Sequence, residues 1–236
     1  MDQYLYLALN LFAVSFPLAR SFESKIRYSH EWYALFPAII VTGAILLVWD
    51  HYFTVWGVWE FNPRYLIGIS FFKLPLEEWL FFLTVPFACI FIYVVLIYFF
   101  PKDFFKPVGK PLVYILIPGF LVFGFMHLDK IYTTVNFFFA AGVLFLHFQV
   151  HRDRYLGRFI LTYLVVLIPF FLCNGILTGG MTEEPVVIYN PSGILGFRIW
   201  TVPMEDIIYN FSLLLMTVSI FEYVRARKTI QLTQGL

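Results

Sequence analysis

Residues 62–82 read NPRYLIGISFFKLPLEEWLFF, and residues 190–211 read NPSGILGFRIWTVPMEDIIYNF. An offset of 128 residues aligns four features of the two stretches: Asn62-Pro63 with Asn190-Pro191, Gly68 with Gly196, Pro75 with Pro203, and Glu77-Glu78 with Glu205-Asp206. Chance is a poor explanation for four features at one constant spacing. The sequence therefore predicts an internal duplication, and a repeat of this kind constrains the whole fold.

The composition around these stretches is that of a membrane protein. Of the 236 residues, 61% are hydrophobic and only 13% are charged, against about 25% charged in an average soluble protein. A soluble domain of this length could not bury so much apolar surface. The formal net charge of +1 gives no indication of a nucleic-acid partner. We therefore expect the lipid bilayer to be the solvent of this chain.

Seven apolar stretches are long enough, or nearly so, to cross the bilayer, since a spanning helix needs about 20 residues. They are Gln3–Ala19, Tyr33–Trp49, Pro75–Phe100, Pro111–His127, Ile131–Val150, Phe159–Leu177 and Pro203–Tyr223. The first opens with Asp2 in place of a basic region and has no small-residue cleavage site after it. We expect it to be a retained helix and not a signal peptide.

The duplication organises these helices into an all-α polytopic fold. The offset of 128 lays the first helix on the fifth, the second on the sixth and the third on the seventh, with no gap expected. The fourth helix is left as a connector, which makes the two repeats parallel and relates them by a pseudo-two-fold axis along the membrane normal. The predicted parts of this single membrane domain are repeat one (1–105), the connector (106–129) and repeat two (130–236).

Basic residues predict the orientation. Twelve of the 16 lie on one side of the predicted helices, three in each of three loops and three in the tail. The other side holds only Arg64, Lys73, Lys130 and Arg198. By the positive-inside rule, the N-terminus lies outside and the C-terminus in the cytoplasm.

The repeated acid pairs, Glu77-Glu78 and Glu205-Asp206, open the third and the seventh helix. They could be ordinary first-turn residues, because proline and acids both suit a helix N-terminus. The uncharged stretch Ile207–Phe221 is only 15 residues long, about 22 Å of helix against ~30 Å of hydrocarbon. Some of Glu205, Asp206 and Glu222 must therefore lie at or inside the hydrocarbon boundary. Acids at membrane depth usually face a bundle interior and serve function. Two carboxyl pairs facing each other in an apolar site cannot all ionise, so we expect a Brønsted acid beside a carboxylate base.

The paired Pro-x-Glu-(Glu/Asp) motifs, PLEEW and VPMED, each preceded by an Asn-Pro loop, resemble the small membrane lycopene cyclases. In that family the two halves are separate subunits in some bacteria and fused in others, and the cyclase part of fungal cyclase–phytoene synthase enzymes is related. The resemblance covers essentially the whole chain. It implies a lipophilic carotenoid substrate, a bacterial cytoplasmic membrane, and other enzymes of carotenoid biosynthesis as potential partners.

The family implies conversion of the linear ends of lycopene to β-ionone rings, giving β-carotene or γ-carotene. By motif position, the acid–base residues are Glu77, Glu78, Glu205 and Asp206, with the acid and the base not distinguished. The reaction is an isomerisation, and no Gly-rich dinucleotide fingerprint is present, so no cofactor is expected. Aromatic faces can stabilise a carbocation. Candidates near the acids, predicted to bind substrate, are Trp79, Phe82, Trp200 and Tyr209.

The remaining polar residues carry structural predictions. Asn62-Pro63 and Asn190-Pro191 are expected to set turns, and Pro75 and Pro203 to start helices. Asp50 and His51 end the second predicted helix at the outer side and could touch the site. The offset pairs them with Thr178 and Gly179, which excludes a two-fold role, so an interfacial cap is favoured. The histidines show no metal-ligand spacing, and no metal site is predicted.

Other functions remain open at this stage. A seven-helix retinal protein is disfavoured because all seven lysines lie in predicted loops, at helix ends or in the tail. A small proton-coupled transporter also suits parallel repeats with intramembrane acids. Against it, Pro86 has Leu214 as its counterpart, so no helix is broken at matching positions of both halves. Another non-redox carotenoid or prenyl enzyme could use the same acid pairs.

Overall fold

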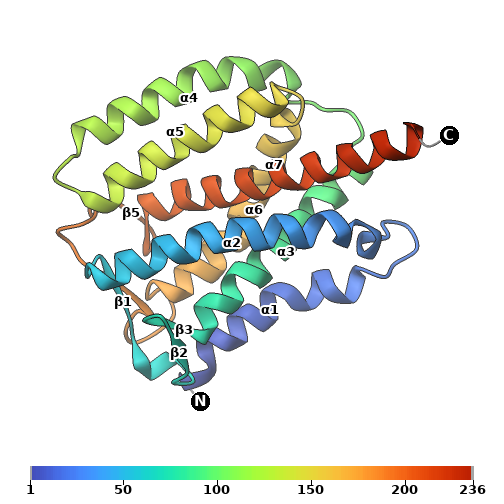
Figure 1. Cartoon of the computed structure of the whole chain (residues 1–236). Helices are drawn as coiled ribbons and strands as arrows, with labels where there is room; N and C mark the ends of the chain where they lie inside the picture. Colours follow the sequence, from blue (N-terminus) through green and yellow to red (C-terminus); the bar gives the residue numbers. More distant parts are fainter. Residues whose placement is uncertain (1, 235–236) are drawn as a thin grey trace.

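A computed structural model describes residues 2–234, and these residues are mostly helical. The α-helices within them are α1 (Leu5–Arg20), α2 (Trp32–Val55), α3 (Leu76–Phe99), α4 (Lys106–Met126), α5 (Ile131–His151), α6 (Leu156–Leu177) and α7 (Met204–Gln234). Short 3-10 turns lie at Asp2–Tyr4, Tyr28–Glu31 and Pro63–Tyr65. Figure 1 shows the helices side by side in one bundle, with the N-terminus and the C-terminus at opposite ends.

Six of these helices, α2 to α7, are long and apolar enough to cross a membrane. The α-helix α1 is shorter, with 16 residues. Large apolar side chains point away from the bundle, among them Ile40, Ile115 and Ile168, which are about 70% exposed. A soluble monomer rarely presents so much apolar surface. The prediction of an all-α polytopic membrane protein is confirmed.

Short strands link the helices at the end of the bundle that carries the N-terminus (Figure 1). Strand β1 (Trp59–Phe61) pairs antiparallel with β4 (Val187–Tyr189). Two hairpins, β2 (Ser70–Phe71) with β3 (Leu74–Pro75) and β5 (Arg198–Ile199) with β6 (Val202–Pro203), lead directly into α3 and α7. The sequence analysis expected plain loops here. Two- and three-residue strands leave little periodicity to detect.

These strands repeat with the predicted offset of 128. In the β1–β4 pair, Glu60 lies opposite Ile188, its own counterpart 128 residues later, so the pseudo-two-fold axis passes through this pair. The turns before the hairpins use Gly68 at φ 87° and Gly196 at φ 81°, a left-handed conformation that glycine adopts without steric cost. The same backbone geometry therefore positions the first turn of α3 and of α7.

The offset changes within the helices, so the expectation that the repeats align without a gap is wrong. The Asn10 amide donates to the backbone oxygen of Glu77, and the Asn136 amide donates to that of Glu205. Asn10 and Asn136 are 126 residues apart, whereas the two glutamates are 128 apart. Loops tolerate a change of length, while buried polar contacts fix the register of a helix. The division into repeats and connector stays a prediction.

The third helices of the two repeats lie at the centre of the bundle. Helix α3 contacts α1, α2, α6 and α7, while α7 contacts α2, α5 and α6 as well as α3. Helix α4 packs on α5 and α6 at one side of the bundle. The helices that begin with the acid pairs therefore meet each other, and helices of both repeats enclose them.

Helix α7 carries one more buried acid at its opposite end. Glu222 accepts a hydrogen bond from Tyr93 and pairs with Arg225, with an N–O distance of 2.9 Å. Arg225 also pairs with Glu31. Removing one of these partners would leave a buried carboxyl group uncompensated. Glu222 therefore has a structural role in joining α7 to α3 and, through Arg225, to the turn before α2.

We predict that reporter fusions at Lys106 and Arg154 read cytoplasmic, because both lie with the excess of basic residues. A fusion near Ser192, close to the strands, should read external. Reporter pairs that are active on opposite sides of the membrane measure this directly. An external signal at Arg154 would contradict a bundle in which α5 and α6 both span.

Candidate active site

Each hairpin ends in a proline that starts the next helix. Pro75 precedes α3 and Pro203 precedes α7, both at a position where the missing N–H of proline costs nothing. The two acid pairs occupy the first turns of these helices. All four carboxyl groups are buried, with at most 6% of any of these residues exposed. They are not residues of a solvated helix end.

The first acid of each pair holds the loop that precedes its own helix. Glu77 Oε1 accepts the backbone N–H of Ile67 at 2.7 Å, and Glu205 Oε1 accepts that of Leu195 at 2.8 Å. Ile67 and Leu195 are themselves 128 residues apart. Glu205 also accepts a hydrogen bond from Thr133. Glu77 and Glu205 therefore anchor the outer loops onto α3 and α7.

The second acid of each pair lines one cavity that the two repeats share. Glu78 from α3 and Asp206 from α7 both reach it, and so do residues of α1, α2, α5, α6, β1 and β4. Its lining is Tyr6, Asp50, Trp59, Phe61, Glu78, Phe81, Tyr132, Phe170, Asn174, Leu177, Val187, Tyr189, Asp206, Tyr209, Asn210 and Leu213. The volume is about 60 Å³, enough for a few water molecules.

Asp206 is surrounded by hydrogen-bond donors. It accepts from the hydroxyl of Tyr132 at 2.9 Å, the amide of Asn174 at 2.8 Å and the hydroxyl of Tyr189 at 2.9 Å. Burial and the nearby Asp206 carboxylate raise the pKa of Tyr189, which lies in the outer loop, well above its ordinary value. Its phenol therefore keeps its proton and donates. Three donors favour the ionised form of a carboxyl group.

Glu78 has a different environment. It accepts a hydrogen bond from Tyr6 at 2.6 Å, and the carboxyl group of Asp50 lines the same small cavity and interacts with that of Glu78. Asp50 also accepts from the hydroxyl of Tyr209 at 2.9 Å. The expectation that Asp50 caps the second helix is wrong, because α2 continues to Val55 and Asp50 is 4% exposed inside the bundle.

The conclusion that Asp50 has no two-fold counterpart near the site is also wrong. Asn174 of α6 bonds to Asp206 in the way that Asp50 of α2 contacts Glu78. These two residues are 124 apart, so they occupy equivalent places that a uniform offset of 128 does not reveal. For that reason the uniform offset favours a helix cap for Asp50 over a role in the site. Its position inside an apolar helix was the signal that could have found it.

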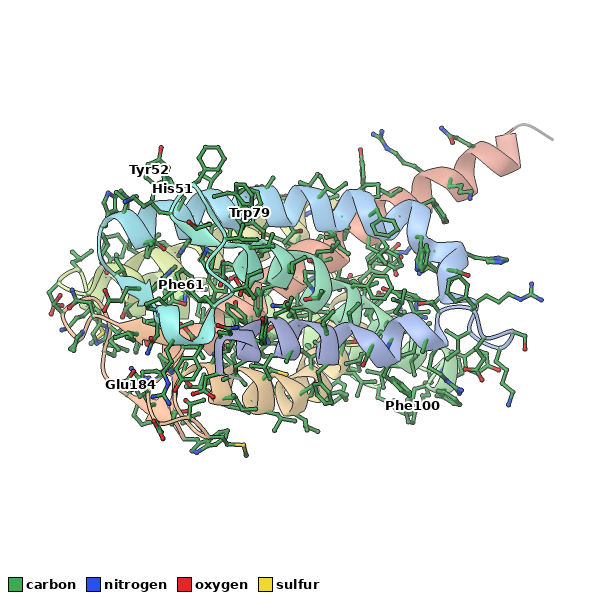
Figure 2. All side chains as sticks on the ribbon, turned by 90° about the horizontal axis from the view of Figure 1, so that it is seen from below. His51, Tyr52, Phe61, Trp79, Phe100 and Glu184 are labelled. Atoms are coloured by element: carbon green, nitrogen blue, oxygen red, sulfur yellow. The ribbon has the colours of Figure 1, made fainter. Side chains whose placement is uncertain are left out.

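The four aromatic residues predicted to bind substrate lie in different places. Tyr209 lines the cavity, and Phe82 packs behind it with Leu46 and Leu213. Trp79 donates to the Phe71 oxygen at 3.4 Å, and Figure 2 shows it on the same edge of the bundle as His51. Trp200 lies in the second hairpin, 52% exposed, with its ring against Gly175 and Gly180. Only Tyr209 of the four reaches the cavity.

The two Asn-Pro motifs shape the loops around the site. Asn62 Oδ1 accepts the N–H of Arg64, and Asn190 Oδ1 accepts the N–H of Ser192. The Asn62 amide also donates to Glu184, which Figure 2 places at the end of the bundle that carries the strands. Each asparagine therefore closes the turn over its own proline. Neither lines the cavity.

The model of the lycopene cyclase family matches residues 3–96 and 129–224. The chain belongs to the lycopene cyclase family. The two matched regions begin 126 residues apart and end 128 residues apart, in agreement with the offsets of the helices and the hairpins. No curated protein and no solved structure shows significant similarity to the chain.

Membership of this family identifies the chain as an integral membrane protein with a role in lycopene cyclisation. The shared cavity with Glu78, Asp206 and Asp50 is the candidate active site. Across residues 2–234, no group of three or more His, Cys, Asp or Glu side chains has an arrangement that could hold a metal ion. The chemical groups that the site offers are carboxyls, phenols and aromatic faces.

We predict that Glu77→Leu destabilises the first outer loop and that Glu77→Gln does not. Leucine leaves the partly buried N–H of Ile67 without its acceptor, which costs up to ~1–3 kcal/mol, whereas glutamine keeps an acceptor oxygen. The measurement is the rate of trypsin cleavage after Arg64 and Lys73, which flank the anchored segment, with Glu60→Gln as an exposed control. Equal cleavage of the leucine and glutamine variants would refute the anchoring role.

Proposed function

We propose that this protein is a lycopene β-cyclase that forms β-ionone rings by acid–base catalysis. A carboxyl group at the cavity protonates the terminal double bond of a linear carotenoid end. The neighbouring double bond attacks the resulting cation and closes the ring, and a carboxylate then removes a proton from a ring carbon. One proton enters and one leaves, so the product is an isomer of the substrate and no redox equivalent is consumed.

The observation that carries this proposal is that Glu78 and Asp206 line one cavity between the two repeats. Both are buried, both begin a central helix, and they come from opposite repeats. General acid–base catalysis needs two groups of this kind within reach of one substrate. Glu77 and Glu205, the other two predicted acids, bond instead to loop backbone, and we propose that they support the site without exchanging protons with substrate.

The rest of the lining suits a carbocation. Aromatic rings from both repeats, Trp59, Phe61, Phe81 and Phe170, line the same cavity as the acids. Their faces can stabilise positive charge through the ring quadrupole. Aromatic and aliphatic side chains in the lining also limit the access of bulk water to the cation, which would otherwise be trapped as an alcohol. Of the four aromatic residues predicted from the sequence, Tyr209 keeps this role, and Phe82 supports the cavity wall from behind Leu213.

We also propose the setting of the reaction. The carotenoid is dissolved in the bilayer of a bacterial cytoplasmic membrane, with the N-terminus outside and the C-terminus in the cytoplasm. The strands and the acid cavity then lie toward the outer face. Enzymes that deliver lycopene or use its cyclic product are the expected partners within the same membrane.

We predict that Glu78→Gln and Asp206→Asn each lower ring formation by ~10²–10⁴-fold, the usual contribution of a general acid or base. Glu77→Gln and Glu205→Gln should stay within about tenfold of the parent, because glutamine keeps the acceptor for the loop and at most a hydrogen bond is weakened. The assay is conversion of lycopene by purified protein in lipid. The reverse ranking would assign the chemistry to the first acid of each pair.

A further inference from the structure

The two repeats differ at the positions that surround their second acids. Tyr6 and Tyr132 are equivalent and both donate to the acid of their own repeat. Phe61 in the first repeat corresponds to Tyr189 in the second, which adds a donor to Asp206. Asp50 corresponds to Asn174. The frame is therefore symmetric, while the hydrogen-bond partners of the two acids are not.

This difference determines where a proton is held. Asp206 faces two phenols and an amide, which are all donors, so its oxygens are satisfied as a carboxylate. Glu78 faces one phenol and the carboxyl group of Asp50, which is buried and lines the same cavity of about 60 Å³. Two carboxyl groups can hydrogen bond to each other only if one of them carries a proton. In addition, two buried anions in contact would repel strongly.

We propose that Asp50 and Glu78 share the proton that is delivered to the carotenoid, and that Asp206 is the base. Asp50 acts through Glu78 and is a positioning residue for the acid. At each turnover the Asp50–Glu78 pair loses one proton to the terminal double bond, and Asp206 gains one from the ring carbon. Exchange with solvent restores both. This assignment rests on the proposed function, whereas the shared proton can be measured without it.

The proton is visible by infrared spectroscopy as the carbonyl stretch of an un-ionised carboxylic acid. Purified protein in lipid at neutral pH should show this band, and Asp50→Asn should lose it, because Glu78 then faces an amide as Asp206 does. Asn174→Asp should gain a second band, because it creates a carboxyl pair in the other repeat. Glu77→Gln and Glu205→Gln identify any band that belongs to the loop-anchoring acids.

Asp50→Asn should also lower ring formation by ~10²-fold or more, as expected for loss of a general acid. Tyr209→Phe removes the hydroxyl that bonds to Asp50 but keeps both carboxyls, so it should retain the infrared band. The proposal is overturned if Asp50→Asn keeps the band, or if it loses the band and stays as active as the parent. A band that behaves as predicted in a protein unable to cyclise lycopene would refute the proposed function alone.

A second inference concerns the long linear part of the substrate. The acid cavity, at about 60 Å³, is too small for a cyclised carotenoid end. A groove of about 450 Å³ lies nearby between α2, α5 and α7. It is lined mainly by apolar side chains, including Ile45, Val143, Met216 and Ile220. Its outer residues Leu146 and Val150 are more than half exposed, so the groove opens toward lipid.

Three aromatic rings separate the groove from the acid cavity. Phe139 lines the groove, Tyr209 lines the cavity, and Trp49 contacts both, with ring centroids 5.1 Å and 5.9 Å apart. A rotamer change at these rings would join the two spaces. From Phe139 to Val150, the groove follows α5 over 11 residues, about 16 Å. It therefore offers an extended apolar track whose near end is separated from the acid cavity by these three rings.

We propose that this groove holds the linear polyene of the carotenoid while its end reaches Glu78 and Asp206. The groove can be tested by binding alone. In a Glu78→Gln background, which keeps the substrate unconverted, protein purified from lycopene-accumulating cells should retain lycopene. Met216→Trp, and the milder Ile220→Phe, should lower the retained amount several-fold by filling the groove. Phe145→Trp, a lipid-facing change on α5 outside the groove lining, should not.

Equal retention by the groove variants and by Phe145→Trp would overturn this second proposal, as expected if an ordinary lipid chain occupied the groove. The outcome is independent of catalysis, because the background variant lacks the acid. If the groove variants lose lycopene and the parent protein forms no rings, the groove remains a carotenoid site and only the proposed reaction is refuted.

Discussion

A carboxylate that bonds to the backbone of its own preceding loop is the interaction on which this structure depends. Glu77 holds the N–H of Ile67, and Glu205 holds that of Leu195. Backbone donors that are removed from water need partners within the protein, and both of these N–H groups are partly buried. By fixing the loop on the first turn of the helix, each glutamate also fixes the direction of the next residue. Glu78 and Asp206 consequently face the same cavity from the two central helices.

The symmetric frame and the asymmetric partners have different physical roles. Each half has a glycine with positive φ, a hairpin and one asparagine that donates to helix backbone. These features recur because both halves must position the first turn of a central helix. The reaction, however, needs one group that gives a proton and another that takes one. The first repeat has Asp50 where the second has Asn174, and Phe61 where the second has Tyr189. These differences give the two acids different surroundings without disturbing the frame, as different surroundings separate the roles of paired carboxyls in other enzymes.

Much of this could be predicted from the sequence, since the decisive features are local. Asn-Pro, glycine and Pro-x-acid-acid motifs at constant spacing revealed the duplication, and long apolar runs revealed the helices. The spacing could not separate Glu77 from Glu78, because neighbouring residues differ only in the direction they face. Asp50, Tyr6, Tyr132 and Asn174 were missed because the repeat offset drifts to 126 and 124 residues in the helices. Trp79 and Trp200 were selected by nearness in sequence, which does not bring them to the cavity.

The measurement that tests this account most directly is deuterium incorporation during ring formation in heavy water. A carboxyl proton exchanges with solvent between turnovers, and the base removes a different hydrogen from the ring carbon. The account therefore predicts that purified protein in lipid converts lycopene to a product that gains about one deuterium per ring, with no nicotinamide or flavin consumed. Ring formation without any deuterium gain would contradict a carboxyl acid at this cavity.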